Sequence, residues 1–109
     1  MSATPAVDRT LSALADTHRR RVVELLGDGP MRAGDLAAAV GLAAPAMSRH
    51  LRILRAGGLI AESHPESDAR VRLYRLIPEP LLELEAWLTE MQVLWSDQLA
   101  SFKAHVEGG

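Results

Sequence analysis

The chain has 109 residues, of which 48% are hydrophobic, so it can bury one core but has no room for a second domain unless a partner subunit completes it. It contains no cysteine, which excludes disulfides, thiolate nucleophiles and the zinc sites that are built on thiolates. The formal net charge is −2, but the charges are unevenly distributed along the chain. Residues 17–75 hold ten Arg against six acidic residues, and residues 76–109 hold one Lys against six acidic residues. This distribution predicts either a basic surface with an acidic far end or a solvated surface of mixed sign.

The N-terminal residues contain neither a basic stretch nor a long apolar run, and no run of about 18 apolar residues occurs anywhere in the chain. We therefore expect no signal peptide, no membrane partner and a cytoplasmic location.

Two helices are predicted to open the chain. The first covers about residues 7–15, where Val7, Leu11 and Leu14 recur at helical spacing. Asp16 can accept hydrogen bonds from the amides that begin the second helix, which runs to about Leu26 and is stopped by glycines and a proline. Residues 31–32 then form a short extended link.

Residues 33–56 are the most informative stretch. A short helix over Asp35–Val40 ends at Gly41, and Pro45, a residue favoured in the first turn of a helix, begins the next one. In that next helix one side is apolar (Met47, Leu51 and Leu54), and the opposite side carries Ser48, Arg49, Arg52 and Arg55. Two helices joined by a tight turn that contains Gly, the second with an Arg-rich exposed face, are typical of a helix-turn-helix reader.

A wing and a long helix are predicted to follow. Residues 59–63 and 71–76 have the pattern of two strands joined by a polar turn, so a hairpin wing covers about residues 59–76. From residue 79 to about residue 106, apolar side chains step by three or four positions, which indicates one helix. About 28 helical residues would span roughly 40 Å, more than the diameter of this domain, so part of the helix should pack on a second subunit.

Four segments of the chain resemble the ArsR family of bacterial winged-helix repressors, in the family's order and spacing. They are LADTHRRRVVELL at 14–26, GDLAAAVGL at 34–42, PAMSRHLRILRAGGL at 45–59 and RLYRL at 72–76. The tail PEPLLELEAWL at 78–88 is similar to a branch of the family that does not sense metals. One departure is that Ala43 or Ala44 stands where the family often places a capping Ser, which weakens the helix start by about 0.5 to 2 kcal/mol.

The length and the patterns predict a mainly α fold with a small β-hairpin wing, a winged helix-turn-helix in a single domain over residues 1–109. The resemblance to the family agrees with that fold. It also implies a homodimer joined through the first and last helices, about residues 7–15 and 79–106, and bound to double-stranded DNA at an inverted repeat in a promoter. The apolar side chains expected at the dimer interface are Leu11, Leu14, Leu84, Trp87, Leu88, Met91, Trp95 and Leu99.

The second reader helix supplies most of the predicted DNA contacts. An Arg in the major groove can donate two hydrogen bonds to a guanine edge, so Arg49 and Arg52 are the expected base contacts. Ser48 lies on the same face and Pro45 at its start, and a merely solvated helix face is the alternative. Arg55, a turn further on, is expected either to contact a phosphate or to form an ion pair.

Further basic residues are expected to contribute from outside that helix. Arg70 and Arg72 flank the tip of the wing and can reach an adjacent minor groove or a phosphate. The arginines at positions 19–21 can contact phosphate or pair with a neighbouring helix.

No metal and no cofactor are expected. His50 is expected to be half-buried and to pack or hydrogen-bond, rather than to contact a base. The other histidines are scattered, and no two are spaced as ligands on one helix face. Asp97 and His105 are eight positions apart, so a symmetric metal site at the dimer interface stays an alternative.

Three functions come into consideration for these residues. The first is a homodimeric, sequence-specific DNA-binding regulator, most simply a repressor. The second is a winged-helix module that binds another protein without specific DNA binding, since a fold alone does not fix a function. The third, an enzyme, is not expected, because the chain has no Gly-rich phosphate loop and no paired carboxylate and His beside a nucleophile. An effector could be a small molecule or a protein, and Trp87 and Trp95 could line its pocket instead of a core or dimer interface.

Overall fold

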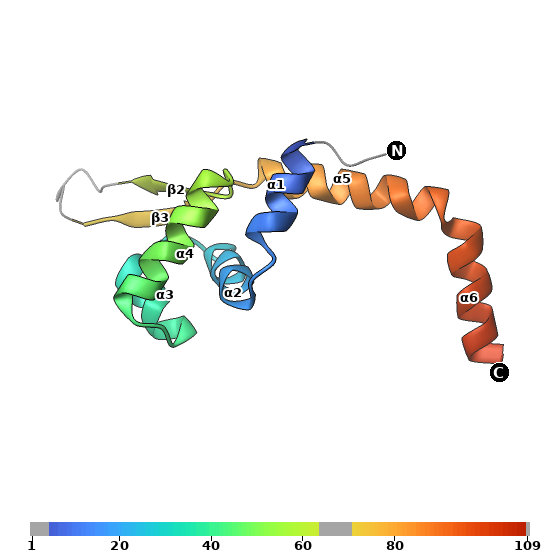
Figure 1. The fold of residues 1–109 in the computed structure, drawn as a ribbon, viewed down its shortest axis with the longest axis horizontal. Helices are drawn as coiled ribbons and strands as arrows, with labels where there is room; N and C mark the ends of the chain where they lie inside the picture. Colours follow the sequence, from blue (N-terminus) through green and yellow to red (C-terminus); the bar gives the residue numbers. More distant parts are fainter. Residues whose placement is uncertain (1–4, 64–70, 109) are drawn as a thin grey trace.

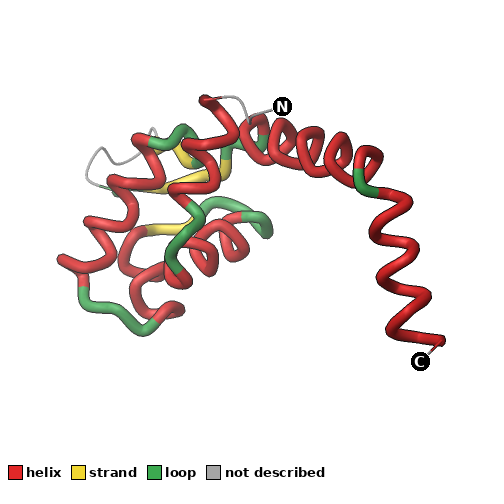
Figure 2. The backbone as a smooth tube through the Cα atoms, turned by 45° about the vertical axis from the view of Figure 1, so that its right-hand side comes forward, coloured by secondary structure: helices red, strands yellow, loops and turns green. Residues whose placement is uncertain are grey.

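The computed structural model describes residues 5–63 and 71–108, and in them the chain is mainly helical with a small antiparallel sheet. In chain order the elements are α1 (Pro5–Ala13), α2 (Thr17–Leu26), β1 (Met31–Arg32), α3 (Ala33–Val40), α4 (Ala44–Ala56), β2 (Ile60–Ser63), β3 (Leu73–Leu76), α5 (Glu79–Leu94) and α6 (Ser96–Gly108). The first four helices and the sheet form one body, from which α5 extends before α6 turns away (Figures 1 and 2). This is the predicted winged helix-turn-helix fold.

The sheet has three strands in the order β1-β3-β2. The hairpin of β2 and β3 is the predicted wing, with Ile60 opposite Leu76 and Ser63 opposite Leu73. The predicted extended link is in fact β1, whose Met31 lies opposite Tyr74. A strand of two residues is too short to show an alternating pattern, so the sequence did not reveal its pairing.

The helix ends follow local chemistry. Asp16 caps α2 as predicted, because its Oδ1 accepts hydrogen bonds from the amides of His18 at 2.8 Å and Arg19 at 3.2 Å. Gly41 ends α3 in the left-handed region at φ +80°, and its amide donates to the carbonyl of Ala37. The first residue before α4 is Ala43, which makes no side-chain cap, as expected from the sequence.

One continuous core joins α1 to α4 with the sheet. Leu36, Leu54 and Leu59 have no exposed surface, and Tyr74 of β3 is buried in the same cluster. The apolar side of α4 therefore faces this core, while its polar side points outward. This packing fixes the orientation of α4 relative to the wing.

The prediction of one helix over residues 79–106 is wrong, because the helix breaks at Trp95. Trp95 has φ −103° and ψ 9°, which leaves the helical region, and α5 and α6 run in different directions on either side of it (Figure 1). The Ser96 hydroxyl donates to the carbonyl of Val93 at 3.1 Å. Such a bond from Ser competes with the helical ladder and favours a bend, an effect that apolar periodicity does not register. The terminal helix therefore does not span 40 Å in a straight line.

In the described part of the chain, no helix is both long enough and apolar enough to cross a membrane.

Candidate nucleic-acid interface

The outer face of α4 is the most basic exposed surface of the reader helices. Met47, Leu51 and Leu54 are at most 2% exposed and anchor the helix. The residues predicted to contact DNA from α4 are all exposed: Pro45, Ser48, Arg49, Arg52 and Arg55. Among the described residues, Arg49 and Arg52 form no ion pair, so no acidic partner screens their guanidinium groups at the surface.

The wing brings a further Arg beside α4. A pocket of about 170 Å³ between the helix and the wing is lined by Ser48, Leu51, Arg52, Arg55, Arg72 and Tyr74. Four of these side chains belong to α4, and Arg72, which precedes β3, joins them from the wing. Arg70, also predicted at the wing tip, lies outside the described residues.

Glu62 of β2 lies among these basic side chains, a position that its place in the sequence does not predict. Its Oε2 pairs with Arg55 Nη1 at 2.9 Å and accepts a hydrogen bond from the Tyr74 hydroxyl at 3.3 Å, and its Oε1 lies 3.6 Å from Arg72 Nε. Burial raises the pKa of Tyr74, and the charge and hydrogen bond of Glu62 raise it further. The ion-pair alternative that the sequence left open for Arg55 is therefore the one observed.

The predicted half-buried position of His50 is confirmed, with 18% of its side chain exposed. It belongs to a group that we call the His50 cluster, formed by Asp16, His18 and Arg19 of the α2 start together with His50 of α4. Arg19 Nη1 lies 3.3 Å from His50 Nδ1, and Arg19 Nε donates to the carbonyl of Ala13 at 2.7 Å. The cluster ties α4 to the turn between α1 and α2.

The electrostatics of this cluster favour an ionised carboxylate. Desolvation raises the pKa of Asp16, but the amide hydrogen bonds from Arg19 and His18 and the nearby charges of His50 and Arg19 outweigh it, so that the pKa is lowered overall. The His18 and His50 rings are 5.6 Å apart, centroid to centroid. Sequence reasoning missed the cluster because it searched for ligand pairs on a single helix, whereas these residues come from two.

The predicted dimer residues fall into three groups in the single chain. Leu11, Leu88, Trp95 and Leu99 are between 43% and 49% exposed. Leu14, Leu84 and Trp87 are half-buried, and Met91 is only 5% exposed, so it has little surface left for a partner. The Trp87 Nε1 atom is buried, and no hydrogen-bond partner for it occurs within the described residues.

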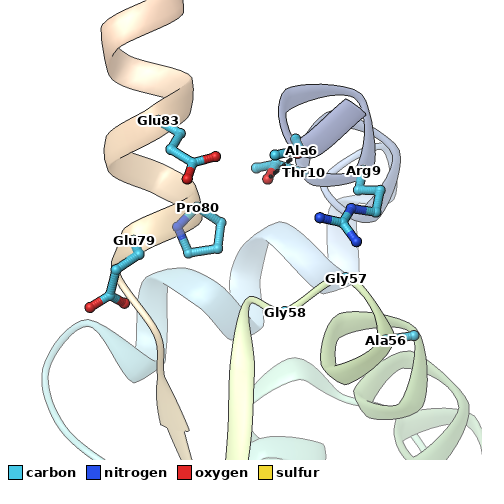
Figure 3. A pocket seen from close by; sticks show the side chains of 9 residues that line it. All are labelled: Ala6, Arg9, Thr10, Ala56, Gly57, Gly58, Glu79, Pro80 and Glu83. Atoms are coloured by element: carbon cyan, nitrogen blue, oxygen red, sulfur yellow. Dashed lines mark hydrogen bonds between the residues drawn. The ribbon is translucent and has the colours of Figure 1, made fainter. Parts of the chain in front are cut away.

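Two hollows lie where α1 approaches α5. One, of about 170 Å³, is bounded by Ala6, Arg9 and Thr10 of α1, the turn at Gly57 and Gly58, and Glu79, Pro80 and Glu83 at the start of α5 (Figure 3). Its volume is below the about 300 Å³ at which pockets for drug-sized ligands begin. The other, of about 510 Å³, is lined by Trp87 together with Ala6, Val7, Glu83, Ala86 and Glu90.

Comparison with known proteins supports the assignment of this fold to a DNA-binding transcriptional regulator. A family described as a helix-turn-helix domain matches residues 14–63. The HTH-type transcriptional regulator Rv2034 of Mycobacterium tuberculosis is 35% identical over 102 residues, which cover 94% of this chain and 90% of that protein. The transcriptional repressor SdpR of Bacillus subtilis is 34% identical over 56 residues, which cover 51% of this chain and 62% of the repressor.

Solved structures agree with this result. The crystal structure of an ArsR family transcriptional regulator is similar with a TM-score of 0.75 and 34% identity, over 88% of this chain and 97% of that one. The homodimeric winged helix-turn-helix DNA-binding domain from Mycobacterium bovis is similar with a TM-score of 0.63 and 25% identity, over 84% of this chain and 83% of that one.

Proposed function

The chain belongs to the ArsR family of winged helix-turn-helix transcriptional regulators, and on that premise we propose that it is a homodimeric repressor of transcription that binds an inverted-repeat operator. The observation that carries the proposal is the exposed face of α4, where Arg49 and Arg52 stand without ion pairs in the described structure beside a wing that adds Arg72.

The proposed complex places α4 in the major groove. Arg49 and Arg52 then read guanine edges, since each can donate two hydrogen bonds to one base. Arg55 and Arg72 lie on the side that faces the wing, where contacts to phosphate position the protein without reading sequence. Because phosphate contacts release counterions, affinity should fall steeply with salt.

The proposed homodimer rests on the apolar surface at the C-terminal end of the chain. Apolar side chains that a single chain leaves exposed follow one another along the break and α6. Among them are Trp95, Leu99 and Phe102, at 48%, 49% and 69% exposure. A patch of this kind marks an interaction surface. A second copy would bury it, and it would place two α4 helices about one turn of DNA apart, so that occupancy of the promoter blocks transcription.

The test is a titration of the purified protein onto its own upstream DNA and onto random DNA, at several salt concentrations. The double variant Arg49→Ala, Arg52→Ala should lose the preference for the upstream DNA while remaining dimeric in sedimentation. The control double variant Arg9→Ala, Arg21→Ala removes the same charge from α1 and α2. Neither residue is an expected base contact, so this variant should keep the preference even if its overall affinity falls.

A dimeric wild type that binds both DNAs equally would overturn the proposal. In that case the second function considered for this fold, a protein-interaction module, would take the lead, since a fold alone does not fix a function.

A further inference from the structure

The start of α2 and the middle of α4 bring together two imidazoles and a carboxylate that the proposed DNA contacts do not use. His18 Nδ1 lies 3.5 Å from Asp16 Oδ1, and His50 Nδ1 lies 3.8 Å from the same oxygen. One candidate ligand atom from each of the three residues lies within 4.8 Å of the other two. We propose that Asp16, His18 and His50 form a binding site for a divalent transition-metal ion of the Zn²⁺ type, placed between α2 and α4.

The distances suit such an ion. Ligands about 2.0–2.1 Å from a tetrahedral centre are about 3.3–3.4 Å from one another, so both separations from Asp16 are within about half an ångström of the required value. The candidate ligand nitrogens of the two imidazoles lie within 4.8 Å of each other. His18 is on the surface, with 46% of its side chain exposed, so its ring can turn at little cost while His50 stays in place.

The ligand chemistry is also appropriate. Two imidazoles and one carboxylate are a donor set that Zn²⁺ accepts in proteins, with a water molecule in the fourth position. Both amide hydrogen bonds of the helix cap go to Oδ1 of Asp16, so an ion at that oxygen replaces the longer of them, from Arg19 at 3.2 Å, or binds Oδ2, which accepts neither of them. In the arrangement observed, Arg19 approaches Nδ1 of His50, which is the acceptor nitrogen of the ring in that contact.

Arg19 competes with the ion for Nδ1 of His50. Its Nη1 lies 3.3 Å from His50 Nδ1, so an ion bound at that nitrogen replaces this contact and pushes the guanidinium group aside. The hydrogen bond from Arg19 Nε to Ala13 is made by another nitrogen and can hold the side chain near its present position. The repulsion between the two cations lowers the affinity, which places the site among those that bind ions reversibly rather than among structural zinc centres.

The experiment is a titration of the untagged, metal-free chain with Co²⁺ as the probe, followed by visible absorption, and then displacement by Zn²⁺. The wild type should bind one Co²⁺ per chain with the strong visible bands of a tetrahedral site. His18→Gln and Asp16→Asn should each weaken binding by about tenfold or more, since even losing a residue behind a ligand costs 10- to 100-fold. Asn can still cap α2, and His18 is exposed, so circular dichroism should show both variants folded.

His105→Gln is the matched control, because His105 is an exposed histidine on α6, away from the cluster. Its Co²⁺ binding should equal that of the wild type. Absence of saturable binding to the wild type, or equal binding by His18→Gln, would overturn the proposal. Loss of binding in His105→Gln alone would also overturn it and would place the ion on α6. The titration contains no DNA, so its result is independent of the proposed repressor function.

Discussion

Removal of the negative charge of Glu62 should tighten the binding of DNA. The carboxylate is 14% exposed and pairs with Arg55, whose side chain is 52% exposed, and it also lies near Arg72. In Glu62→Gln the amide keeps the shape and can still accept a hydrogen bond, but it no longer neutralises the two arginines or repels phosphate. Ion pairs with an exposed partner are worth about 0.2–1 kcal/mol, so we expect about 1.4- to fivefold tighter binding.

The salt dependence gives the sharper measurement. If Glu62→Gln frees one Arg for a phosphate, the slope of log affinity against log salt should steepen by about one unit. The control is Glu24→Gln on α2, which removes an equally charged partner from a surface pair, Arg21 with Glu24 at 3.8 Å. It should leave both affinity and slope at the wild-type values. An unchanged or weakened affinity for Glu62→Gln with an unchanged slope would refute this role of Glu62.

The same substitution has a second readout inside the protein. The chain has one tyrosine, so its ionisation can be followed by ultraviolet absorption without interference from another phenol. Burial, which Glu62→Gln leaves in place, raises the pKa of Tyr74, and the charge and hydrogen bond of Glu62 raise it further. The pKa of Tyr74 should therefore fall in the variant yet stay above its ordinary value. A pKa that does not move would show that the carboxylate and the hydroxyl do not interact in solution.

Three further outcomes follow from the fold. Because the raised pKa of Tyr74 favours its neutral form in the folded chain, stability should decline as pH rises above about 10, and it should decline less in Glu62→Gln, as measured by urea unfolding. Leu36→Ala, at a fully buried site, should cost about 2–5 kcal/mol of unfolding free energy, and a cost below 1 kcal/mol would contradict the described core. Leu99→Glu, on exposed α6, should shift the sedimentation equilibrium toward monomer while the unfolding of the monomer is unchanged, and a dimer as tight as that of the wild type would remove α6 from the interface.

The reader helices were predictable because their signals are local. The apolar spacing of Met47, Leu51 and Leu54 identifies the buried side of α4, and Gly41 marks the end of α3 by a conformation that other residues adopt at a cost. Asp16 identified the start of α2 in the same way. In each case the residue acts on backbone within four positions of itself, which is the range that pattern reasoning covers.

What the sequence did not reveal depends on contacts between elements. His50 and Arg19 are 31 positions apart, and only the packing of α4 on α2 brings them together. Glu62 reads as an ordinary polar residue on the outer face of a strand until the hairpin register sets it opposite Tyr74. The break at Trp95 lies beside a hydrogen bond from the Ser96 side chain to the carbonyl of Val93, and the apolar spacing continues on both sides of it, so the spacing gives no sign of the break.

The position of Glu62 bears on specificity as well as affinity. Contacts to phosphate strengthen binding to every DNA sequence alike, whereas contacts to base edges strengthen binding to the operator alone. In the described structure Glu62 pairs with the arginines nearest the wing, and Arg49 and Arg52 on the outer face of α4 have no such partner. If the chain binds DNA as proposed, the carboxylate reduces the sequence-independent part of the affinity and does not offset the charge of the proposed reading residues. On this argument a repressor gains discrimination by giving up affinity, because random sites in a genome vastly outnumber its operator.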